Sequence, residues 1–156
     1  MSEQSRYGPV IDSLVAGRLP ELGPGSQNEA MRAALQSVQA PAACRAGLWL
    51  LHDFLDESHT ISQDDHSAEG SFWHAIMHRR EPDPSNSKYW WRRVGPHPVL
   101  RQLREAGIGF TSPEAFVDEC ERVRGTGSPD EDRAKQVQLL EWKLLFDWCW
   151  RLRSVP

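Results

Sequence analysis

This sequence of 156 residues has few cysteines, no long apolar run and no net positive charge. Its three cysteines, Cys44, Cys120 and Cys149, are an odd number without C-x-x-C spacing, which argues against a disulfide framework and a cysteine zinc site. No segment approaches the roughly 18 uninterrupted apolar residues of a membrane-spanning helix. The first ten residues lack the basic and apolar pattern of a secretion signal. We therefore expect a soluble, cytoplasmic protein without a membrane partner.

Positive charge is concentrated in one part of an otherwise acidic chain. The net charge is -4, yet residues 71–104 carry seven basic and two acidic side chains. Non-specific nucleic-acid binding requires a broad positive surface, so nucleic acid is not an expected partner. A local basic cluster suits a small anion, or ion pairs with the acidic segments on either side. Nothing in the sequence indicates an oligomeric state.

Helix-start patterns recur through the second half of the chain. A capping residue followed by proline, which is favoured at the first helical position, occurs four times, at Asp83-Pro84, His97-Pro98, Ser112-Pro113 and Ser128-Pro129. Glu131 follows Ser128 by three residues and completes a capping-box pattern. No segment alternates between apolar and polar residues as a strand would. The sequence therefore predicts an all-α fold.

The domain organisation follows from proline, glycine and apolar spacing. Residues 1–26 contain three prolines and four glycines and are expected to form an extended N-terminal segment, apart from a short turn over residues 10–15. Residues 27–156 are expected to form one compact domain of six or seven helices, two of which cover residues 27–39 and 42–58. On the second of these, His52, Asp56 and His59 are spaced by four and three residues and should form one polar stripe. The last helix, over residues 129–153, is apolar around most of its circumference, so the others should pack around it.

Residues 71–98 contain most of the side chains with recognisable chemistry. On a helix over residues 71–81, His74, His78 and Glu81 fall at intervals of four and three and share one face. Two imidazoles at this spacing can bind one divalent metal ion, with Glu81 as a third ligand and His52, His59 or His97 as ligands from elsewhere. The same three residues are the candidate catalytic groups, since histidine beside glutamate can transfer protons near neutral pH. No nucleophile is evident.

An anion site is the second hypothesis for this segment. Arg79 and Arg80 carry planar donor groups that suit phosphate or carboxylate, Asn86 and Tyr89 add neutral donors, and Trp90 offers a stacking surface. The alternative is that the arginines pair with carboxylates inside the protein and join helices. Three carboxylates could serve in this way, namely Glu81, Glu141 and Asp147.

The segment also resembles a known pattern. Residues 73–90 read WHxxxHRREPDxxNxxYW, and this run, continued by Arg93-Val94-Gly95 and preceded by Ser58-His59 and Gln63, resembles a family of small uncharacterised proteins over roughly residues 47–98. The resemblance implies no reaction, cofactor or catalytic role. It does imply that His59 and Gln63 belong with the segment.

Three functions remain open from the sequence. The first is a polar pocket that recognises a small anionic or polyhydroxylated metabolite, either binding it only or also converting it. The second is a metal-dependent enzyme that uses His74 and His78. The third is a protein-interaction module with a surface of tryptophan and arginine. The residues predicted to bind the ligand in the first case are His59, Gln63, Arg79, Arg80, Asn86, Tyr89 and Trp90.

Overall fold

The computed structural model describes residues 5–154, which form nine α-helices, one short 3-10 helix and no β-strand. The predicted all-α class is confirmed, whereas the predicted number of six or seven helices is wrong. The elements are α1 (Pro9–Val15), η1 (Glu29–Met31), α2 (Arg32–Ser37), α3 (Ala42–Leu51), α4 (Leu55–Ser62), α5 (Ala68–Arg80), α6 (Pro84–Val94), α7 (Pro98–Glu105), α8 (Pro113–Val123) and α9 (Pro129–Leu152).

The four predicted helix starts are all present. At each one a side chain accepts a hydrogen bond from a backbone N–H two or three residues further on, and proline occupies the first helical position. The capping residues are Asp83 for α6, His97 for α7, Ser112 for α8 and Ser128 for α9. The capping box is incomplete, because the Glu131 carboxylate turns to the N–H groups of residues 125 and 127.

Two helices account for the difference in number. The helix predicted over residues 42–58 is interrupted, so that α3 ends at Leu51 and α4 begins at Leu55. Between them Asp53 adopts a φ of +69°, and its carboxylate accepts hydrogen bonds from Arg18 at 2.7 Å and Arg80 at 2.5 Å. These two contacts stabilise a left-handed backbone position that a helix cannot contain. The second extra helix is α1, which occupies the turn expected at residues 10–15 and buries Ile11 and Leu14.

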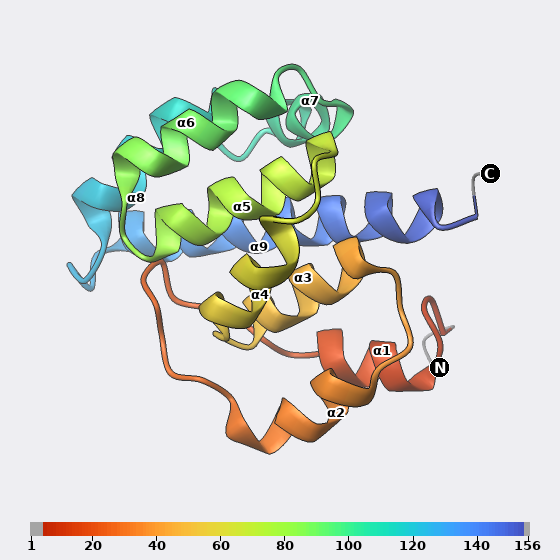
Figure 1. The fold of residues 1–156 in the computed structure, drawn as a ribbon. Coiled ribbons are helices and arrows are strands. Elements are labelled where there is room, and N and C mark those ends of the chain that lie inside the picture. Colours follow the sequence, from red (N-terminus) through yellow and green to blue (C-terminus); the bar gives the residue numbers. More distant parts are fainter. Residues whose placement is uncertain (1–4, 155–156) are drawn as a thin grey trace.

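Helix α5 is the most enclosed element. Every residue from Gly70 to Arg80 is buried, with α6 along one side, α4 and α3 on another and α9 behind (Figure 1). Helix α9 packs on α3, α7 and α8, but Lys143 on its outer face is exposed, so it shares the core with α5 and is not enveloped. Gly47 of α3 permits the close packing, because a Cβ there would lie 2.6 Å from Trp73 Cζ2.

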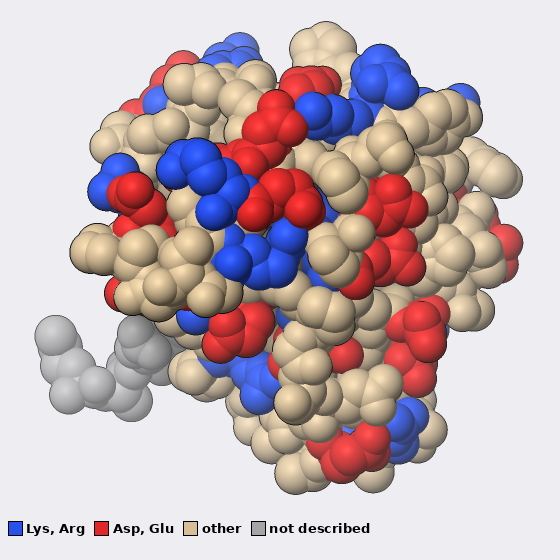
Figure 2. Space-filling model, turned by 90° about the vertical axis from the view of Figure 1, so that its left-hand side faces the viewer, with Lys and Arg blue, Asp and Glu red and all other residues tan. Residues whose placement is uncertain are grey.

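Positive and negative side chains are mixed on the face of the molecule shown in the space-filling view. Figure 2 shows lysine and arginine interleaved with aspartate and glutamate on the face it presents, without a large patch of one sign. This face therefore lacks the broad positive surface that non-specific nucleic-acid binding requires. None of the described helices combines the length and the apolar composition needed to cross a bilayer.

Candidate functional site

Three histidines converge where α4 meets α5. His59 comes from α4, and His74 and His78 lie one turn apart on α5. The ring centroids of His74 and His78 are 4.7 Å apart, and the His59 ring lies 4.8 Å from the first and 5.4 Å from the second. One ring nitrogen from each residue lies within 4.8 Å of the others. The structure therefore brings together the two predicted metal ligands and His59, and we call these three residues the histidine cluster.

The interruption at Asp53 determines which residues reach the histidine cluster. Had α3 continued to residue 58, His52, Asp56 and His59 would share one stripe, as the sequence predicted. Instead His52 ends α3 and is buried against the N-terminal segment, with its Nε2 2.7 Å from the Leu14 carbonyl oxygen. Helix α4 starts in a new direction and carries His59 to α5. The predicted stripe is thus absent.

His74 is the most constrained member of the histidine cluster. Its side chain is buried, and its Nδ1 has no hydrogen-bond partner among the described residues. Its ring stacks on Trp90 of α6 with a centroid distance of 3.8 Å and an interplanar angle of 17°. Burial, and secondarily the charges of His78 and His59, lowers the pKa of His74 to about 4. The imidazole is therefore neutral at pH 7, which is the form that binds metal ions.

His78 is oriented by a carboxylate. Its Nδ1 lies 2.5 Å from Glu81 Oε1, so the ring donates its Nδ1–H to that carboxylate. Asn86 Nδ2 lies 3.5 Å from the same Nδ1. A histidine that binds a metal ion through one ring nitrogen commonly donates the N–H of its other ring nitrogen to a carboxylate. Glu81, His78 and Asp83 also place potential ligand atoms within 4.8 Å of one another.

The spacing of the histidine cluster is close to that of a metal site. Zn–N bonds of about 2.0–2.1 Å in tetrahedral geometry imply nitrogens about 3.3 Å apart. The nitrogens of the cluster lie within 4.8 Å of one another, so the rings would have to move closer together to bind one ion. His59 is only partly buried, which gives it the freedom to make that adjustment. The cluster can therefore offer three imidazole nitrogens to one ion.

Arg79 and Arg80 are occupied inside the protein. Arg79 is fully buried and donates to both carboxylate oxygens of Glu141 on α9, at 2.7 and 3.0 Å. Arg80 donates to Asp53 and to the carbonyl oxygens of Gly23 and Leu50. Both arginines therefore form internal ion pairs, which was the alternative hypothesis. Glu141 was among the three carboxylates named from the sequence, whereas Asp53, the partner of Arg80, was not. Neither guanidinium group is free to bind a ligand.

The remaining predicted residues divide into two groups. Asn86 and Trp90 contact the histidine cluster, as described above, and Tyr89 is exposed beside Trp90 with a ring-centroid distance of 5.2 Å. Gln63 is exposed at the end of α4, and no hydrogen bond joins its side chain to the cluster. His97, named as a further metal ligand, caps α7 and binds Glu69 through Nε2 at 2.9 Å.

One residue beside the site was not predicted. The Arg93 guanidinium carbon lies 5.5 Å from the ring centroid of Trp90 and 5.9 Å from that of Tyr89. Its positions three and four residues after these aromatic side chains on α6 could have indicated the contact, because such residues are neighbours on a helix surface.

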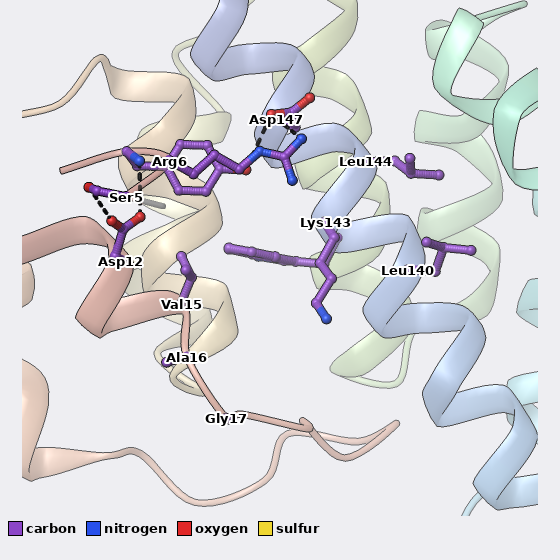
Figure 3. A pocket seen from close by; sticks show the side chains of 12 residues that line it. Ser5, Arg6, Asp12, Val15, Ala16, Gly17, Leu140, Lys143, Leu144 and Asp147 are labelled. Atoms are coloured by element: carbon purple, nitrogen blue, oxygen red, sulfur yellow. Dashed lines mark hydrogen bonds and ion pairs between the residues drawn. The ribbon is translucent and has the colours of Figure 1, made fainter. Parts of the chain in front are cut away.

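A surface groove of about 780 Å³ lies elsewhere, between the N-terminal segment and α9 (Figure 3). Two of its four charged side chains pair with each other, and Asp12 accepts hydrogen bonds from the Ser5 hydroxyl and the Tyr7 N–H. Asp147 pairs with Arg6 at 3.3 Å and with Arg151 at 3.1 Å, and the Tyr7 hydroxyl donates to Asp147. No residue of the histidine cluster lines it, so the groove is separate from the candidate site.

No family model, curated protein or solved structure matches the chain. The resemblance described for residues 47–98 therefore stays a prediction, and the function is argued from the site itself.

Proposed function

We propose that the protein binds a divalent transition-metal ion through His59, His74 and His78 and is a metal-dependent enzyme. One observation carries the proposal. Three imidazole nitrogens from two helices converge within 4.8 Å, and the Nδ1 atom of His74 is buried without a hydrogen-bond partner. Buried polar atoms without partners are rare in folded proteins and call for an explanation. A metal ion held by the histidine cluster supplies one, because ligation occupies the lone pairs of the imidazoles.

The ligand set indicates the kind of chemistry. Imidazole ligands suit zinc, copper, iron and nickel, whereas magnesium and calcium prefer oxygen. Three protein ligands leave a coordination position for water, and a bound zinc ion lowers the pKa of that water to about 7. An ion held by the three histidines would activate a water molecule, so hydrolysis of a small polar substrate is the reaction class that we propose. Glu81 orients His78 through the contact at Nδ1 and is a positioning residue in this scheme.

The two other functions considered from the sequence have less support. Recognition of an anion by Arg79 and Arg80 conflicts with their internal ion pairs. An interaction surface built on tryptophan conflicts with the burial of Trp91 and the stacking of Trp90 on His74. Trp73, Arg79 and Trp91 in this segment also each have a buried side-chain N–H without a partner among the described residues, but only the imidazoles of the histidine cluster have lone pairs that can bind a metal ion.

Removal of the ligands tests the proposal. We expect near-stoichiometric zinc, iron, nickel or copper in protein purified without a histidine tag or chelator, measured by elemental analysis. His59→Ala and His74→Ala should each lose the metal. His66→Ala is the matched control, since His66 is exposed and outside the histidine cluster. Equal metal content in wild type and both cluster variants, or failure of metal-free wild type to bind added zinc, would contradict the proposal.

A further inference from the structure

Arg93 differs from the buried and paired cations of its segment. It is exposed on α6, and no ion pair joins it to an acidic side chain of the described residues. Three of the six other basic residues between positions 71 and 104 bind carboxylates, at 2.7 Å from Glu141, 2.5 Å from Asp53 and 2.7 Å from Asp118; these are Arg79, Arg80 and Lys88. The charge of Arg93 is therefore not neutralised by a neighbouring carboxylate.

Aromatic rings hold the Arg93 side chain without occupying its hydrogen-bond donors. Its guanidinium carbon lies within 6 Å of the ring centroids of both Tyr89 and Trp90, the range of a cation–π contact. Such a contact uses the face of the guanidinium and leaves its N–H groups at the edge. A planar fork of free N–H donors fits a carboxylate or a phosphate. We call Tyr89, Trp90 and Arg93 the anion platform.

The anion platform adjoins the histidine cluster. Trp90 stacks on His74 at 3.8 Å, so one indole ring contacts both a proposed metal ligand and the Arg93 guanidinium. Tyr89 stands perpendicular to Trp90 and is 45% exposed, which leaves an aromatic surface for a ring of a bound molecule. The anion platform and the histidine cluster therefore share Trp90.

We infer that the substrate is a small ring-containing molecule with a carboxylate or phosphate group, and that Arg93 binds this group while the reacting bond lies at the histidine cluster. The inference rests on the proposed metal site and names the substrate class of that site. The ligand is an anion, as the sequence analysis predicted, but Arg93 recognises it in place of Arg79 and Arg80.

Titration of the full-length, zinc-loaded protein tests the inference. The probes are benzoate and phenylphosphonate, with benzyl alcohol as a neutral ring without an anionic group, and the readout is the NMR shift of the Trp90 indole N–H. We expect at least one of the two anions to bind, and benzyl alcohol to bind more weakly than that anion. Arg93→Gln should weaken anion binding roughly tenfold or more, because a charged hydrogen-bond donor is lost. Arg92→Gln is the matched control, as Arg92 is an exposed neighbour without these aromatic contacts.

The outcomes separate the two proposals. A preference for phenylphosphonate or for benzoate identifies the phosphate or the carboxylate class. Equal affinity of wild type and Arg93→Gln, or no saturable binding of either anion by wild type, overturns the inference while zinc binding stays intact. If zinc does not bind to wild type, the proposed function fails, and the same titration of zinc-free protein decides the role of Arg93. Anion binding by the zinc-free protein that depends on Arg93 supports the anion platform, and the absence of such binding overturns the anion platform.

Discussion

His74 illustrates how a single residue can indicate a missing partner. A buried polar atom without a hydrogen bond costs about 1–3 kcal/mol of stability, and His74 Nδ1 is such an atom. Most other histidines of the chain avoid this cost through specific contacts. His52 binds Asn28 and the Leu14 carbonyl, and His97 binds Glu69. Ligation of a metal ion would remove the cost at His74.

Glu81 provides the first prediction at this scale. Glu81→Gln should weaken zinc binding by about 10–100-fold, because the glutamine no longer offers His78 a charged acceptor. Zinc affinity is measured by competition with a chromophoric chelator. Glu69→Gln is the control, since it alters the same kind of contact at His97, away from the histidine cluster. Unchanged zinc affinity in Glu81→Gln would show that the carboxylate does not position a ligand.

His52 provides a prediction about pH. Burial, and secondarily the charge of Arg18, lowers its pKa below the ordinary value of 6.5. As the pH falls below 6.5, the unfolded chain therefore takes up a proton at His52 that the folded protein refuses. The free energy of unfolding should fall with the pH in that range and be independent of His52 above it. Urea unfolding at several pH values should show a shallower acid loss in His52→Gln than in wild type, and parallel profiles would contradict the assignment.

At the scale of elements, the Arg79–Glu141 pair joins α5 to α9. Both side chains are fully buried, so removal of one leaves an uncompensated charge in the core. Glu141→Gln should lower the free energy of unfolding by about 3–5 kcal/mol, as measured by chemical denaturation. The double variant Arg79→Met/Glu141→Leu should recover most of this loss. A single variant as stable as wild type would mean that the pair does not join the helices.

Local signals predicted elements well, and long-range contacts explain where prediction failed. The starts of α6, α7, α8 and α9 depend on a capping side chain and a neighbouring proline, which are adjacent in the sequence. The interruption between α3 and α4 depends on Asp53, whose partners Arg18 and Arg80 are 35 and 27 residues away. No local pattern could reveal that contact. The separate α4 was therefore missed.

At the scale of the whole molecule, the same long-range contacts decide the composition of the site. The spacing of His74 and His78 on one helix was sufficient to place them together. His59 joins the candidate site because α4 starts in a new direction. Arg79 and Arg80 do not join it because they are buried and paired with Glu141 of α9 and with Asp53. Burial of α5 thus pairs two predicted ligand-binding arginines with carboxylates inside the protein, so the proposed site rests on the histidine cluster.

The central claim is that three histidines from two helices bind one metal ion. X-ray absorption spectroscopy of the zinc-loaded protein tests it most directly, because the spectrum reports the number and distance of imidazole ligands. We predict three imidazole nitrogens at about 2.0–2.1 Å together with one oxygen, and two nitrogens in His59→Ala. A zinc environment made of oxygen ligands, or one that His59→Ala leaves unchanged, would contradict the account.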